Sequence, residues 1–247
     1  MKKILLLLCI ILTIRSTAQE TNKTINRQYQ SWLSVNSLWR LSHKWGFAVD
    51  LHQRRNHFLR DNSFNFVRIG INYWIKDNLT VTAAYGHMWV APVTPGYSTW
   101  ADENRICEQV QLTTRLGKVT MLQRLRNEQR WQEKIVNDQE TGENKFTDRV
   151  RYLLAVTIPV FKNPWYPALT VSDELHVQFG KEVVYNTFDQ NRAFVGIRQA
   201  VTKNLFFDLG YMLFSQQKAS GMVYDQNHTF RWFFYYMPDF RKKPSAD

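Results

Sequence analysis

Charged side chains occupy every second position in the middle of the stretch MLQRLRNEQRW, residues 121–131. A strand has a side-chain period of two, so such a stretch would carry the charges in one row and the neutral residues in the other. Guanidinium groups near a carboxylate either form ion pairs with that carboxylate or bind an oxyanion from solution. The charged row consists of Arg124, Arg126, Glu128 and Arg130.

Further charges continue this pattern downstream. If the chain folds back around a polar loop at 132–145, Arg149 and Arg151 face the same side as Glu128. Across the next turn, the row that follows contains Glu174 and His176. We therefore expect a basic patch in which Glu128 and Glu174 are the counter-charges.

A separate ion pair is expected between Arg198 and Asp208. These residues are equidistant from the turn at Thr202-Lys203-Asn204, so a tight hairpin makes them cross-strand partners.

Two interpretations of the basic patch remain open. In the first it is structural, an Arg/Glu network that fills a narrow interior and satisfies its own charges. In the second it lines an anion-selective pore or a cavity that binds small anionic solutes. Removing Arg126 and Arg151 together would separate them, because a pore would lose anion selectivity whereas a filler would mainly lose stability.

A lipid-modifying enzyme is a further alternative, which would need a nucleophile and a base in hydrogen-bonding contact. Ser172 and His176 lie four strand residues apart, roughly 13 Å, on the same face. They cannot form such a pair, and only a cross-strand pair such as Ser215 with His228 stays open. We expect no enzyme activity.

The sequence indicates no metal or cofactor site and no nucleic-acid partner. The six histidines lack metal-ligand spacing, and no glycine-rich loop could cradle a phosphate. We interpret His52 and His57, beside Arg54 and Arg55, as a loop margin that faces anionic lipid head groups. Cys107 is expected to be an inert, buried wall residue.

The elements that would position these residues are strands. From residue 29 onward, apolar residues alternate with polar ones over stretches long enough to cross a bilayer, which needs about nine to eleven tilted residues. Short connections that contain a lysine beside a turn former alternate with longer polar ones. The longer connections are expected near 55–63, 90–102, 132–145, 180–190 and 216–225.

The stretch 122–136 is locally ambiguous, because Leu122, Leu125 and Ile135 also fall near helical spacing. The alternating stretches on both sides favour a strand. An arginine on the lipid face at mid-depth costs roughly 2–4 kcal/mol, so the charged row must then face inward.

This pattern predicts an all-β fold, an antiparallel up-and-down transmembrane β-barrel. Eleven stretches are visible, and bacterial single-chain barrels usually have an even number of strands. Gln19 to Gln28 would supply a twelfth strand, and ten strands is the alternative. An exported lipocalin-like barrel or a sandwich, with its apolar row inside, is the soluble alternative. The stretches begin near 29, 45, 64, 79, 103, 119, 146, 167, 191, 205 and 226.

Residues 1–18 read as a signal peptide, with Lys2 and Lys3 ahead of an apolar run and cleavage expected between Ala18 and Gln19. Residues 19–247 are expected to form one domain in the cell outer membrane, in contact with its lipid and lipopolysaccharide. The formal net charge of +11 stays clearly positive after removal of the signal. No feature indicates an oligomeric state.

Several motifs together resemble an uncharacterised outer-membrane β-barrel family of Gram-negative bacteria, defined only as a domain of unknown function. The resemblance implies a porin-like barrel over nearly the whole mature chain and supplies no activity or catalytic residues. The motifs are Trp32, Lys44-Trp45-Gly46, Arg124-x-Arg126-x-Glu128-x-Arg130, Arg149-x-Arg151 and Phe188-Asp189-Gln190-Asn191-Arg192.

Overall fold

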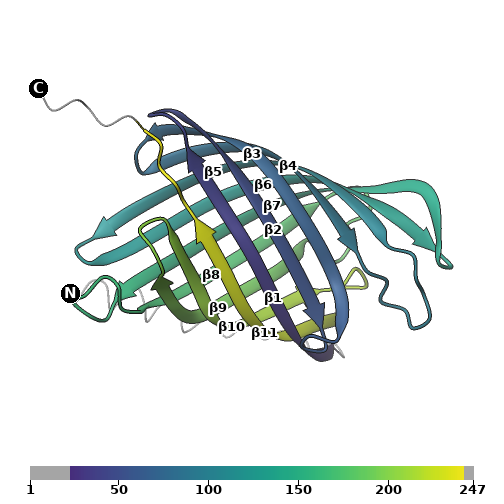
Figure 1. Ribbon diagram of the computed structural model, residues 1–247. Helices are drawn as coiled ribbons and strands as arrows, with labels where there is room; N and C mark the ends of the chain where they lie inside the picture. The colour runs from purple at the N-terminus through teal and green to yellow at the C-terminus, as the bar shows by residue number, and fades with distance from the viewer. Residues whose placement is uncertain (1–22, 242–247) are drawn as a thin grey trace, which may run out of the picture.

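The computed structural model describes residues 23–241, which form one closed β-barrel of eleven strands (Figure 1). The predicted signal peptide, residues 1–18, lies outside the described residues. Within residues 23–241, no helix has the length and apolarity needed to cross a membrane. The strands are β1 (Thr24–Arg40), β2 (Trp45–Asn56), β3 (Asp61–Lys76), β4 (Leu79–Val90), β5 (Ala101–Leu116), β6 (Val119–Val136), β7 (Gln139–Pro159), β8 (Ala168–Phe179), β9 (Phe188–Ala200), β10 (Leu205–Gln217) and β11 (Val223–Tyr236).

The count of eleven corrects the expectation of twelve or ten strands. Each strand pairs antiparallel with the next along the chain, and β11 closes the barrel on β1 in a parallel register from Thr24↔Val223 to Ser37↔Tyr236. An odd number of alternating strands leaves the first and last pointing the same way, so closure requires this parallel seam. Residues 24–28, assigned to an extra strand, instead lengthen β1.

The two ends of the barrel differ in their connections. One end, the turn end, carries the short connections between β1 and β2, β3 and β4, β5 and β6, and β9 and β10, together with the longer connection 160–167 between β7 and β8. The opposite end, the loop end, carries the excursion at 91–100 and the loop at 180–187. The expected loop at 55–63 contracts to residues 57–60, because β2 and β3 extend further than the apolar alternation does.

The prediction of a long loop at 132–145 is also wrong. Over these residues β6 and β7 continue as a hairpin that projects beyond the loop end (Figure 1). Their connection is only Asn137 and Asp138, with φ of 51° and 62°. Two consecutive residues with positive φ match the tight hairpin turn whose twist suits the flanking strands.

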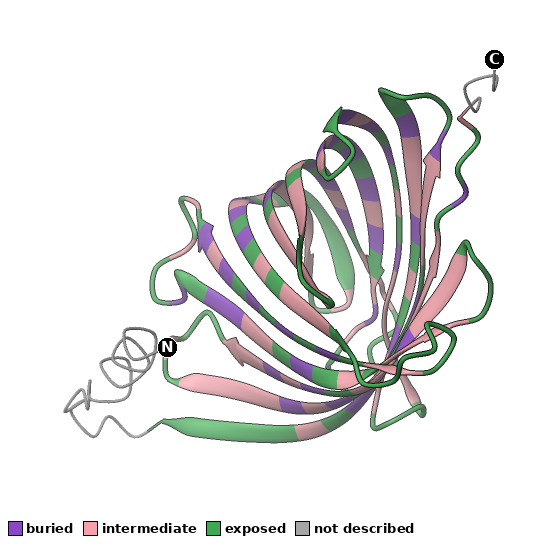
Figure 2. Cartoon of the chain, turned by 90° about the vertical axis from the view of Figure 1, so that its left-hand side faces the viewer, coloured by how far each residue is buried: buried purple, intermediate pink, exposed green. Residues whose placement is uncertain are grey.

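Burial alternates along the strands with the period expected of a wall that has an inner and an outer face (Figure 2). The inner row is mostly polar or charged and buried. The outer row is mostly apolar and exposed, with Ile71 62% and Ile69 58% accessible. A small apolar cluster lies inside, formed by Trp32, Phe194, Met212 and Phe214.

The chain after β11 crosses the end of β1 and extends the seam. The Arg40 amide donates to the Pro238 carbonyl at 3.0 Å, and the Phe240 amide donates to the Arg40 carbonyl at 2.8 Å. The Phe240 ring stacks on Trp39 with centroids 5.8 Å apart. These contacts fasten both ends of the barrel wall together at the turn end.

Candidate functional site

The charged row of β6 points into the barrel, as its period requires. Glu128 is 1% accessible and lies at the centre of an ion-pair layer. Its Oε2 accepts from Nε and Nη2 of Arg149 at 3.0 and 2.5 Å, and its Oε1 accepts from Nη1 of Arg151 at 2.6 Å. Arg126 approaches the same Oε1 at 3.5 Å. One carboxylate thus serves three guanidiniums from two strands.

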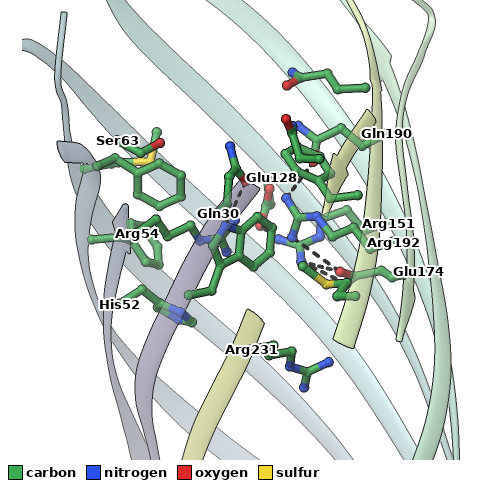
Figure 3. A pocket seen from close by; sticks show the side chains of 18 of the residues that line it. Gln30, His52, Arg54, Ser63, Glu128, Arg151, Glu174, Gln190, Arg192 and Arg231 are labelled. Atoms are coloured by element: carbon green, nitrogen blue, oxygen red, sulfur yellow. Dashed lines mark hydrogen bonds and ion pairs between the residues drawn. The ribbon is translucent and has the colours of Figure 1, made fainter. Parts of the chain in front are cut away.

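Glu174 of β8 is the second shared carboxylate of this layer. Arg151 donates to both of its oxygens at 2.8 Å, and Arg124 donates to Oε1 at 2.7 Å. His176 is completely buried, with Nε2 3.1 Å from Glu174 Oε2. Arg151 of β7 therefore bridges Glu128 and Glu174, which lie on the two neighbouring strands (Figure 3).

Other members of the layer were not identified from the sequence. Glu103 of β5 is fully buried and pairs with Arg105 at 2.5 Å and with Arg130 at 2.9 Å. Asp189 accepts from Arg149 at 3.0 Å. Both acids stand near strand ends. Asp189 of β9 reaches Arg149 of β7 past the intervening strand β8, a contact that only the closed barrel reveals.

Towards the turn end, the pairs become simpler. Arg198 and Asp208 are cross-strand partners, with two hydrogen bonds of 2.7 and 2.9 Å. Arg68 and Asp50, also cross-strand partners, form a second pair that was not predicted, with Arg68 Nε 2.7 Å from the carboxylate. One pair joins β9 to β10 and the other joins β2 to β3, so they lie in different parts of the barrel wall. Neither pair includes Glu128.

The ion-pair layer lies between two hollows of the interior. A cavity of about 380 Å³ extends from Arg126 and Glu128 towards the loop end, and its wall includes Val93 of the 91–100 excursion. Another of about 320 Å³ lies towards the turn end, lined by threonines and by Asp50 and Asp208. Arg124 and Arg126 line both, so the arginines of β6 form part of the partition.

The interpretation of His52, Arg54, Arg55 and His57 as a surface that faces lipid head groups is wrong for His52 and Arg54. Both lie in β2 on the inner row, and Arg54 is only 9% accessible. The Arg54 guanidinium carbon lies 3.2 Å from the ring centroid of Trp32 and 4.5 Å from that of Phe64. Only His57, in the turn, is exposed at the loop end.

The considered nucleophile pairs are not assembled. Ser172 and His176 both point inward from β8, four strand residues apart. The hydrogen-bond partner of His176 is Glu174 and not Ser172. Ser215 is the cross-strand partner of Gln226, whereas His228 lies opposite Leu213 and bonds to the Tyr211 hydroxyl at 2.7 Å on the outer face.

Cys107 is a free thiol, 1% accessible, on the inner row of β5, as expected for a buried wall residue. Across residues 23–241, no three His, Cys, Asp or Glu side chains gather in a group that could hold a metal ion.

Fold and site together define a closed β-barrel with an apolar exterior and an arginine-rich interior. The chain belongs to a family described as a protein of unknown function (DUF2490), whose model matches residues 29–228. This span begins in β1 and ends in β11, so it covers almost the whole barrel. No curated protein and no solved structure matches the chain.

Proposed function

We propose that this protein is an integral outer-membrane β-barrel, in contact with lipid and lipopolysaccharide, whose charged interior is primarily a structural brace. The observation that carries the proposal is the reversed polarity of the wall. Isoleucine, valine and leucine side chains are exposed outside, while arginines and glutamates are buried inside. A water-soluble barrel would lose free energy on both faces with this arrangement.

Aromatic residues near both ends of the outer wall support the proposal. At the turn end, Trp45 and Tyr73 pack together with centroids 4.8 Å apart. At the loop end, Trp131 packs on Phe146 at 5.3 Å. Girdles of aromatic residues near both ends of the outer wall are typical of barrels that cross a bilayer.

The outer wall also contains two acids in mid-strand, and each has an amide partner. Glu108 accepts from Asn127 at 3.4 Å and from Gln129 at 3.3 Å. Asp173 accepts from Asn191 at 2.7 Å. Hydrogen bonds of this kind reduce the cost of a polar group that faces an apolar medium, so these acids are compatible with the proposal.

Fractionation of cells that express the full chain tests the membrane assignment. The barrel should stay with the outer membrane after carbonate extraction and should migrate faster on a gel before boiling than after it. Recovery in the soluble periplasmic fraction would contradict the proposal and would favour an exported soluble barrel.

An anion-selective pore is the second candidate, and the composition of the inner face favours it. Inward arginines outnumber inward acids, and as a result Glu128 and Glu174 are each shared by several guanidiniums. A positive interior attracts anions. In planar bilayers, a pore would conduct with anion selectivity that Arg126→Gln/Arg151→Gln removes. A brace predicts little conductance in the wild type and a large loss of stability in the same variant.

A further inference from the structure

Arg54 differs from the other inward arginines of the ion-pair layer. Among residues 23–241, no carboxylate lies within 4.0 Å of its guanidinium, and its Nε is buried without a hydrogen-bond partner. The flat group instead stacks on Trp32, and the Trp32 indole is held in place by a 3.1 Å bond from its Nε1 to Gln30. The charge is therefore positioned by an aromatic ring and has no carboxylate in contact with it.

Arg192 of β9 approaches the same ring from another part of the wall. Its guanidinium carbon lies 5.0 Å from the centroid of Trp32 and 5.3 Å from that of Phe214. Its nearest carboxylate is Glu174, at 3.6 Å, which already binds Arg124 and Arg151. The Arg192 Nε is also buried without a partner.

Both guanidiniums line the cavity on the loop side of the ion-pair layer. Figure 3 shows Arg54 and Arg192 extending inward from two sides of it, with Gln30 and Gln190 nearby. Gln190 Oε1 accepts from Arg192 at 2.5 Å, so this amide fixes the direction of the guanidinium. The cavity volume, about 380 Å³, is that of a site for a small solute.

We propose that Arg54 and Arg192, arranged around Trp32, form a binding site for a small polar solute that carries an oxyanion group, a phosphate or a carboxylate. The Arg54 guanidinium, which is stacked on the indole, keeps its edge free to donate two parallel hydrogen bonds to an oxyanion. Arg192, which already donates to Gln190, adds a second positive charge. The rings of Trp32 and Phe214 then border the uncharged body of the solute.

The ion pairs elsewhere in the barrel explain why this place is a site and the others are not. Arg149 and Arg198 each meet a carboxylate at 3.0 Å or less, so an incoming anion would have to displace it. At Arg54, an anion would displace no carboxylate and would neutralise a buried charge. Buried unpaired charge is costly, which makes this the most favourable position for an anion in the interior.

Binding to the purified full chain in detergent tests the proposal by titration calorimetry. The probes are inorganic phosphate and glycerol 3-phosphate, with glycerol as the neutral control. We expect saturable binding of at least one phosphate probe, no binding of glycerol, and at least a tenfold loss in Arg54→Gln. Arg54→Lys retains the charge without the forked edge and should bind with intermediate affinity.

Arg198→Gln is the matched control, since it removes an inward arginine that has a carboxylate partner outside this cavity. It should bind the probes as the wild type does. If Arg54→Gln fails to fold by circular dichroism, Arg192→Gln replaces it. An absence of saturable phosphate binding by the wild type at millimolar concentration, or an equal loss in Arg198→Gln, would overturn the site. The inference depends on the closed barrel and not on the membrane, so fractionation and titration can fail separately.

Discussion

Glu128 accepts hydrogen bonds from three arginines while it is almost completely buried, and this single carboxylate determines the stability of the layer around it. Removing a carboxylate from water is costly, and the attraction of neighbouring positive charges offsets that cost only when the geometry is good. All three partners, Arg126, Arg149 and Arg151, are themselves buried. Loss of the carboxylate would leave Arg126 without a contacting carboxylate among residues 23–241, and Arg149 and Arg151 would keep only Asp189 and Glu174.

We therefore predict that Glu128→Gln lowers the free energy of unfolding by about 3–5 kcal/mol. Urea unfolding of the purified protein, followed by tryptophan fluorescence, measures the change. Glu140→Gln, an exposed residue at the tip of the β6–β7 hairpin, is the control and should change stability by less than about 0.5 kcal/mol. Equal stabilities for the two variants would show that the layer does not brace the barrel.

At the same scale, the sequence predicted which residues face inward but not how they pair. The period of two placed Arg124, Arg126 and Glu128 on one face, and the structure has them there. Arg54 was misassigned because apolar alternation stops near Leu51, although the strand continues to Asn56. Its stacking on Trp32 depends on the pairing of β1 with β2, a contact between distant residues that local pattern does not encode.

The β6–β7 hairpin is an element whose tip contacts another loop. Asp138 at the tip accepts from the backbone amides of Thr99 at 2.7 Å and Ser98 at 2.9 Å. These backbone hydrogen bonds, that from Thr99 first, hold the pKa of the Asp138 carboxyl below its usual value. The carboxylate thus fastens the 91–100 excursion to the hairpin at neutral pH.

The sign of this pKa shift gives a prediction for pH. A carboxyl whose pKa is depressed in the folded state stabilises that state above its unfolded pKa, and the contribution disappears as the pH falls through the lower, folded value. We expect protection of the Thr99 amide against hydrogen exchange at neutral pH and its loss in strong acid. Protection factors from NMR, corrected for the intrinsic exchange rate, measure the effect.

Asp138→Asn should weaken the same protection at neutral pH, because an amide has one acceptor oxygen and no charge. Glu143→Gln, on the same hairpin but bonded to Lys134 rather than to the excursion, is the control and should leave Thr99 protected. Unchanged protection of Thr99 in Asp138→Asn would mean that this loop is held by other contacts.

The hairpin itself shows what limited the prediction of elements. Strands were predictable where apolar and polar residues alternate, and the turns at Gly117 and at Asn204 were found from their residue types. Between 132 and 145 only Ile135 and Val136 are apolar, and they are adjacent, so no alternation remains. The two-residue turn uses Asn137 and Asp138, without the glycine that usually marks such turns.

Closure of the barrel formed by residues 23–241 gives every strand a paired neighbour on both sides. The seam between β1 and β11 is parallel, yet it runs over the entire length of β11 and continues into the contact of Arg40 with the chain around Asp239. An open edge would expose unpaired amides and carbonyls, which is costly in an apolar medium and promotes aggregation in water. A barrel can close through an antiparallel or a parallel seam, and the local stretches do not indicate which, so they could not show whether a twelfth strand was needed.

The outward direction of the apolar row is the property on which the membrane assignment depends, and spin labels can measure it. In a Cys107→Ser background, labels at Ile71 and Leu154 should be relaxed by oxygen, which concentrates in acyl chains, and not by a water-soluble nickel chelate. Gln111 lines the interior from β5, so a label there should show weaker oxygen relaxation. Strong nickel relaxation at Ile71 and Leu154 in reconstituted bilayers would mean that this face meets water, and the barrel would then belong to the soluble class. The physical reason for the expected result is the favourable free energy of removing apolar surface from water, about 25 cal/mol for each Å². On this outer face, contact with lipid would remove side chains such as Ile71 from water.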